Sequence, residues 1–157
     1  MTDKPPTTTY RCAVIGNPIA HSRSPEIHAG FAAARGIALR YDRILAADEA
    51  DFAATVARFF ADGGRGLNIT VPYKQTAYRL CGRTTPYAAA AEAVNTLWME
   101  NGQLCGDNTD GRGLRHALEH EHAYPLAGKH ILILGAGGAA RGVIAPLCAA
   151  RPASLHI

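Results

Sequence analysis

The stretch that most constrains the fold is a short apolar run followed at once by a glycine-rich turn. Residues 131–134 read Ile-Leu-Ile-Leu, and four consecutive apolar residues suit a central strand of a parallel sheet, which is buried on both faces. Gly135, Gly137 and Ala140 then fit the pattern G-x-G-x-x-G/A, in which the backbone closely approaches a pyrophosphate at a helix N-terminus. The sequence therefore predicts a parallel α/β sheet with a dinucleotide-binding turn.

Upstream of this turn, short apolar runs alternate with segments that have helical periodicity. Strands are expected at residues 11–15, 39–45, 66–71, 94–99 and 103–105, and helices are expected to start at Ser24, Asp48, Tyr73, Pro86 and Thr109 or Asp110. The fold class is α/β. We expect a substrate domain at residues 10–109 whose mainly parallel sheet is flanked by helices. A connecting helix and the first β-α-β of an incomplete Rossmann-type NAD(P) domain are expected at 110–157.

Composition excludes several other classes of protein. The 157 residues are 48% hydrophobic and 18% charged, and the net charge of +3 comes from scattered side chains rather than a basic block. Nucleic acid is therefore not an expected partner. No apolar run approaches the ~20 residues of a membrane helix, and we expect no membrane partner. The four cysteines are dispersed and form no C-x-x-C pair, which favours reduced thiols in a cytoplasmic protein.

Three polar clusters follow expected strands, at the positions where α/β sheets bind ligands. The first is residues 17–25, in which the Ser22 and Ser24 hydroxyls suit an anionic or hydroxylated ligand, although Ser24 also fits a role as helix N-cap alone. The second is residues 68–74, where strand alternation places Asn68 and Thr70 on one face and Lys74 follows one turn later. The third is residues 106–111, with Asn95 upstream.

Lys74 and a carboxylate of the third cluster are the candidate proton-transfer pair. An ammonium group exchanges a proton with a reacting alcohol, while a facing carboxylate orients it and stabilises its charge. Asp107 and Asp110 are both available for this role, and both also fit ordinary turn and capping positions.

Five segments together give the chain a specific resemblance. They are GNPIAHSRSP (16–25), NITVPYK (68–74), AVNTL (93–97), GDNTDGRG (106–113) and GAGGAAR (135–141). In this order they resemble the shikimate dehydrogenase family, whose members interconvert 3-dehydroshikimate and shikimate with NADP in aromatic amino acid biosynthesis. The resemblance covers residues 10–157 and implies an oxidoreductase that acts on a small-molecule substrate.

The resemblance also implies a role for each matching residue. Lys74 would be the acid/base, paired with Asp110. The substrate carboxylate region would lie at Ser22 and Ser24, and its hydroxyls at Asn68, Thr70, Asn95 and Asp110. The cofactor pyrophosphate would be held by Gly135, Ala136, Gly137, Gly138 and Ala139. No metal is expected.

Several alternatives remain open at this stage. A quinate/shikimate dehydrogenase with looser cofactor choice fits the same motifs, as does a truncated ligand-binding fragment without turnover. The family's adenosine 2′-phosphate segment would fall beyond Ile157, so we expect little or no activity from the 157-residue chain alone. Exposed edges favour association, and a homodimer is a further expectation. The pattern H-x-x-E-H at 116–120 fits zinc peptidases, but its polar surroundings indicate a solvated helix face.

Overall fold

The elements follow the predicted alternation of strands and helices. A computed structural model describes residues 9–157, which divide between two units, residues 9–73 and residues 74–157. The N-terminal unit contains β1 (Tyr10–Gly16), α1 (Ser24–Ala34), β2 (Leu39–Leu45), α2 (Glu49–Ala61) and β3 (Gly66–Ile69). The C-terminal unit contains α3 (Lys74–Leu80), β4 (Arg83–Thr84), α4 (Pro86–Ala91), β5 (Thr96–Glu100), β6 (Gln103–Asp107), α5 (Asp110–His116), the π-helical turn η1 (Ala117–Glu121), β7 (His130–Leu132), α6 (Gly138–Ala149) and β8 (Ser154–His156).

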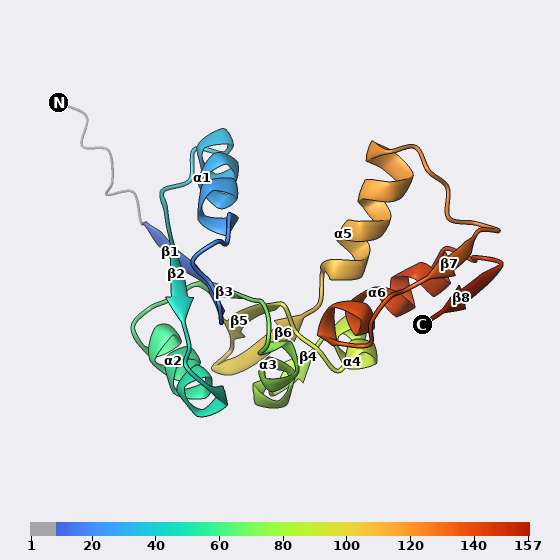
Figure 1. Cartoon of the computed structure of the whole chain (residues 1–157). Coiled ribbons are helices and arrows are strands. Elements are labelled where there is room, and N and C mark those ends of the chain that lie inside the picture. The colour runs from blue at the N-terminus through green and yellow to red at the C-terminus, as the bar shows by residue number, and fades with distance from the viewer. Residues whose placement is uncertain (1–8) are drawn as a thin grey trace. The chain divides into compact units, whose positions relative to one another are not determined.

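In the N-terminal unit three strands lie in the order β2-β1-β3, and both pairings are parallel. Helices α1 and α2 cover opposite faces of these strands (Figure 1). The apolar face of α2 carries Phe52, Val56 and Phe59 at helical spacing, and all three are buried. This half of the chain confirms the prediction of a parallel sheet flanked by helices.

The predicted N-cap is confirmed for α2 and is wrong for α1. Asp48 caps α2 as predicted, because its Oδ1 accepts a hydrogen bond from Asp51 N over 2.9 Å. The prediction that Ser24 is the N-cap of α1 is wrong: Arg23 occupies that position and makes no side-chain cap, and Ser24 is the first helical residue. The Ser24 side chain instead meets Ser22 Oγ at 3.1 Å.

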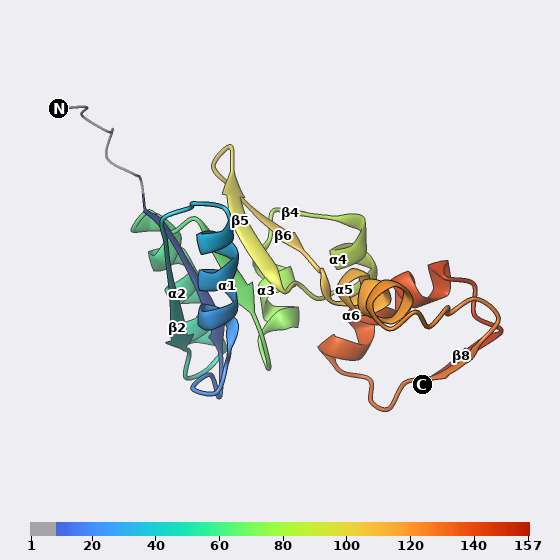
Figure 2. The ribbon, with the colours of Figure 1, turned by 90° about the horizontal axis from the view of Figure 1, so that it is seen from above.

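In the C-terminal unit, β5 and β6 form the predicted hairpin around Asn101 and Gly102. Both turn residues have positive φ (52° and 77°), as a two-residue hairpin turn requires. The short strand β4 runs parallel to β6 and was not predicted, because two residues carry no periodicity. Helices α4 and α5 both pack against α6 (Figures 1 and 2).

The apolar run and glycine-rich turn at residues 131–140 belong to the predicted β-α-β, in which β7 and β8 are parallel and joined by α6. Leu126, Leu147 and Ala150 form its buried cluster. The predicted burial of the apolar run holds on one side only: Ile131 and Ile133 are half-buried against this cluster, whereas Leu132 is 67% exposed and Leu134 is 88% exposed. In the part of the chain that the structure describes, the side of this run that carries Leu132 and Leu134 is left uncovered.

The four cysteines are free thiols in contrasting environments. Burial, with a smaller contribution from the neighbouring Cys105 thiol, raises the pKa of Cys81 to about 11, whereas Cys148 is exposed on α6. A raised pKa lowers the reactive thiolate fraction, to about 0.1% at pH 8. We expect iodoacetamide at pH 8 to alkylate Cys148 long before Cys81, as followed by peptide mass spectrometry. Equal rates in the folded protein would contradict this, while equal rates in urea are expected.

Candidate active site

The polar residues predicted in the N-terminal unit lie at one edge of its sheet. β1 and β3 are parallel neighbours, so the segments that follow them leave the sheet at the same edge. Ser22 and Ser24 lie between β1 and the first turn of α1, whereas Asn68 lies in β3 and Thr70 directly follows it. All four side chains are half-buried. The structure therefore brings the first two polar clusters together within this unit.

Close backbone contact holds these two segments against each other. Asn17 N donates to the carbonyl of Val71 over 3.0 Å, and each segment contains a cis peptide bond, at Asn17–Pro18 and Val71–Pro72. A Cβ at Gly16 would lie 2.4 Å from Thr70 Cγ2 and 2.9 Å from the Val71 carbonyl oxygen. Only glycine allows this approach, which explains the residue that opens the first motif.

Tyr41 of β2 connects the two clusters, although nothing in the sequence singled it out. Its hydroxyl donates to Asn68 Oδ1 over 2.6 Å and is also hydrogen-bonded by Ser24. The ring stacks on His28 of α1, with centroids 4.3 Å apart. Burial is the main cause that raises the pKa of Tyr41 well above its ordinary value. An aromatic residue in an alternating strand usually indicates packing, so no sequence pattern reveals this contact.

In the C-terminal unit, Lys74 forms an ion pair with Asp110. Lys74 Nζ lies 2.6 Å from Asp110 Oδ2, and the two side chains are 14% and 27% exposed. Asn95 Nδ2 donates to the other carboxylate oxygen, Oδ1, over 2.8 Å. Of the two candidate carboxylates, Asp110 is therefore the partner. Asp107 is engaged elsewhere, with Arg112 and with the Thr85 hydroxyl.

Backbone hydrogen bonds fix the positions of these three residues. Val94 N donates to the carbonyl of Lys74 over 2.8 Å, and Asn95 N donates to the carbonyl of Asp107 over 3.0 Å. Asn108, which is 1% exposed, accepts from Asp110 N at 3.1 Å and donates to the Ala93 carbonyl at 3.0 Å. The carboxylate is thus oriented by groups that are themselves held in place.

The glycine-rich turn lies beside Lys74 within the same unit. Gly135 has φ 113°, a conformation that L-residues with side chains rarely adopt, and Gly137 is the N-cap of α6. Gly135, Ala136 and Gly137 are exposed, and a Cβ at Gly138 would lie 3.4 Å from Lys74 Cβ. An accessible helix N-terminus beside the Lys74 side chain suits an anionic ligand.

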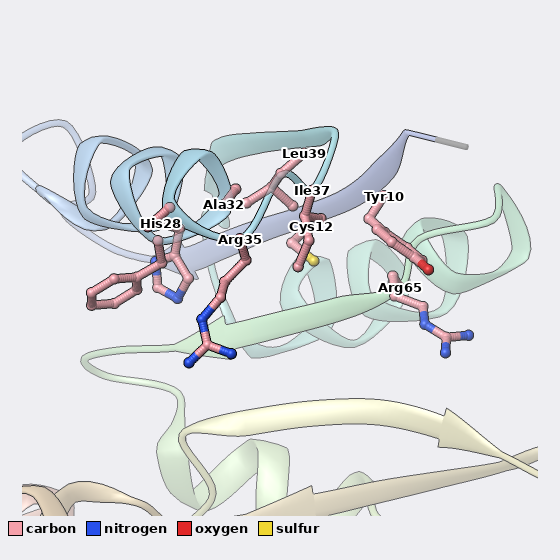
Figure 3. A pocket seen from close by; sticks show the side chains of 10 residues that line it. Tyr10, Cys12, His28, Ala32, Arg35, Ile37, Leu39 and Arg65 are labelled. Carbon is pink, nitrogen blue, oxygen red and sulfur yellow. The ribbon is translucent and has the colours of Figure 1, made fainter. Parts of the chain in front are cut away.

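The N-terminal unit also contains a pocket of about 650 Å³ between α1 and the starts of β1 and β2 (Figure 3). Its lining is mostly apolar, with Arg35 and Arg65 among the labelled side chains. Ser22, Ser24, Asn68 and Thr70 are not among its lining residues. This pocket is therefore separate from the predicted substrate residues of that unit.

The histidine pattern at residues 116–120 lies on α5 and η1. Arg115 Nε donates to Glu119 Oε2 over 2.7 Å, and the rings of His116 and His120 lie 4.8 Å apart. Within residues 9–157, no group of three or more His, Cys, Asp or Glu side chains is arranged to hold a metal ion. Over the same residues, no helix combines the length and apolar character needed to cross a membrane.

Comparison with known sequences places this geometry in a family. The sequence model of the shikimate dehydrogenase substrate binding domain matches residues 14–97. The chain belongs to the shikimate dehydrogenase family. This membership confirms the resemblance drawn from the five motifs, and the matched residues include Ser22, Asn68, Lys74 and Asn95.

Individual relatives and solved structures are similar over almost the whole chain. A shikimate dehydrogenase (NADP(+)) of Cupriavidus taiwanensis is 53% identical over 156 residues, covering 99% of this chain and 52% of the relative. An Ael1 enzyme from Pseudomonas putida superposes with a TM-score of 0.86 at 42% identity, covering 93% of this chain and 54% of that structure. Shikimate 5-dehydrogenase from Thermus thermophilus, solved with shikimate, gives 0.85 at 33% identity, with 94% and 55% covered. The chain spans about half the length of the curated relatives it matches.

Proposed function

We propose that this chain supplies the substrate-binding part of an NADP-dependent shikimate dehydrogenase, which interconverts 3-dehydroshikimate and shikimate. Family membership supports the proposal, as do relatives named shikimate dehydrogenase (NADP(+)) at more than half identity. The term full-length form means this chain continued to the length of those relatives. In that form, we assign residues 10–109 to the substrate domain and 110–157 to the connecting helix and the start of the nucleotide-binding domain.

The ion pair between Lys74 and Asp110 is the observation that carries the proposal. With Nζ 2.6 Å from Oδ2, Lys74 has a proton to donate and a carboxylate that stabilises its charge. We assign Lys74 as the general acid that protonates the developing alkoxide during reduction, and as the base in the reverse direction. Asp110 orients Lys74, and Asn95 orients Asp110.

The remaining substrate contacts are assigned from the family motifs and from hydrogen-bonding capacity. Ser22 and Ser24 would bind the substrate carboxylate. Asn68 and Thr70 would bind ring hydroxyls, as would Asn95 and Asp110. The side-chain amides of Asn68 and Asn95 can both donate and accept hydrogen bonds, and the Asp110 carboxylate accepts them, so these groups suit vicinal hydroxyls.

The cofactor site is assigned to residues 135–139. NADPH bound there would supply the hydride for ketone reduction, and NADP+ would accept it in the reverse direction. The accessible start of α6 and the glycines at 135, 137 and 138 suit its pyrophosphate. Residues of this chain near the turn would position the cofactor, and Lys74 would hold the proton.

The direct test is oxidation of shikimate by the full-length form, followed as NADPH absorbance, with NAD and quinate as comparison cofactor and substrate. We expect shikimate with NADP to be the preferred pair. Preference for quinate would favour a quinate/shikimate dehydrogenase instead. Absence of turnover with either substrate would overturn the proposal.

The 157-residue chain assayed alone should show little or no oxidation of shikimate. Full activity of this chain would contradict a role for the remaining half of the enzyme.

We further propose that the protein works in the cytoplasm, which its four free thiols support.

We also propose that isolated chains self-associate. Leu132, at the end of β7, and Leu134, two residues later, are exposed apolar side chains, and among the described residues β7 and β8 pair with each other alone. We expect light scattering to show a dimer that weakens when Leu134 is replaced by lysine. A monomer at high concentration would contradict the association.

A further inference from the structure

Three residues that the proposed function assigns to the substrate are joined in the N-terminal unit by one residue that has no assigned role. Ser22 Oγ donates to Ser24 Oγ over 3.1 Å, Ser24 is hydrogen-bonded to the Tyr41 hydroxyl, and Tyr41 donates to Asn68 Oδ1 over 2.6 Å. The chain of hydroxyls runs from α1 through β2 to β3. Tyr41 is the side chain that connects Ser24 with Asn68 in this series.

The sheet register explains how Tyr41 reaches both clusters. In β1, Cys12 pairs with Tyr41 on one side and with Gly66 on the other, while Val14 pairs with Asn68. β2 and β3 therefore flank β1, and the Tyr41 side chain crosses over β1 to meet Asn68. A side chain shorter than tyrosine would not span one intervening strand, since neighbouring strands lie about 4.8 Å apart.

The Tyr41 ring is itself held in place. It stacks on His28 with centroids 4.3 Å apart and an interplanar angle of 18°, and His28 Nδ1 is bonded to the Ser24 carbonyl at 2.9 Å. His28 thus ties the ring to the residue that also bonds its hydroxyl. A tyrosine hydroxyl keeps its proton at neutral pH, and burial raises the pKa of Tyr41 further, so the phenol remains a donor well above neutral pH.

A hydroxyl donor on Oδ1 decides which way the Asn68 amide faces. Because the amide group is planar, fixing its carbonyl oxygen on Tyr41 directs the NH₂ group to the opposite side. We propose that Tyr41 is a positioning residue for substrate binding: it orients the Asn68 amide and couples it to Ser24, so that the two substrate clusters recognise one hydroxylated carboxylate together. This inference rests on the proposed function for its substrate.

The test replaces the hydroxyl and keeps the ring. In the full-length form, Tyr41→Phe should raise KM for shikimate about fivefold to tenfold, as expected for losing one orienting hydrogen bond, with kcat almost unchanged. In an Asn68→Ala background the same change should have almost no further effect on KM, because the group that Tyr41 orients is gone. A merely structural role would give the same factor in both backgrounds.

A matched control separates positioning from general loss of packing. Thr55 of α2 is also buried, and its hydroxyl donates to Asp51 Oδ1 over 3.4 Å. Thr55→Val therefore removes a buried hydroxyl and its hydrogen bond in the same unit, outside residues 17–25 and 68–74. We expect it to lower the melting temperature about as much as Tyr41→Phe does, with no change in KM. Equal KM changes in the two variants would overturn the inference.

A second measurement is independent of turnover. In NMR spectra of the 157-residue chain without substrate, the Asn68 side-chain amide should give a single sharp pair of proton signals, which broaden or multiply in Tyr41→Phe. Unchanged signals would overturn the positioning role. If wild type does not oxidise shikimate, the proposed function fails. If it does, and KM is unchanged in Tyr41→Phe, only the present inference fails.

Discussion

Replacing Lys74 by alanine in the full-length form is expected to lower kcat by about 10²–10⁴-fold, with a much smaller change in KM for shikimate. The ammonium is the group placed to give the alkoxide its proton, and it lies 2.6 Å from Asp110. Proton transfer contributes in the transition state, so its loss reduces turnover more than substrate affinity. Steady-state kinetics in the direction of ketone reduction measures both parameters.

Lys129 provides the matched control for this experiment. Its ammonium lies 5.4 Å from the Tyr124 ring centroid, in the connection that precedes β7. Lys129→Ala removes the same charge and side-chain length, and we expect kcat to stay within about twofold of wild type. If Lys74→Ala raised KM and lowered kcat by similar factors, Lys74 would be a binding residue and the acid/base assignment would be wrong.

The chemistry of the C-terminal unit could be foreseen because its residues lie next to strand ends. Lys74 follows the loop after β3, and Asp110 follows β6 after a two-residue connection, so a parallel α/β arrangement alone suggests that they meet. The choice between Asp107 and Asp110 could not come from spacing. It depends on the turn at Asn108, whose buried side chain bonds Asp110 N and the Ala93 carbonyl.

The role of Tyr41 could not be foreseen, for a different physical reason. Its partners Ser24 and Asn68 are far away in sequence, and the contact depends on the register of two separate strand pairings. The exposure of Leu134 has a similar origin. Its apolar character predicts burial, but burial depends on which elements pack on that side of β7, and that information is not local.

Gly111 lies in the contact between α5 and α6, next to the candidate active-site residue Asp110. It is buried in the first turn of α5, one residue after Asp110. A Cβ there would lie 2.5 Å from the Gly142 carbonyl oxygen, 2.5 Å from Pro146 Cγ and 2.9 Å from Val143 Cα on α6. These are backbone or ring atoms that cannot rotate away, so α5 and α6 would have to separate.

We therefore expect Gly111→Ala to destabilise the chain by about 1–3 kcal/mol, the usual cost of overpacking. Gly113 lies on the same helix and is exposed, and a Cβ added there would meet no atom within 4 Å. Gly113→Ala should instead stabilise by about 0.5–1 kcal/mol, because alanine favours the helix over glycine. Chemical unfolding followed by circular dichroism measures both.

Because α5 begins at Asp110, we also expect Gly111→Ala, unlike Gly113→Ala, to lower kcat in the full-length form. Equal stability of the two variants would mean that the helices yield at this crossing, and that the position of Asp110 does not depend on it.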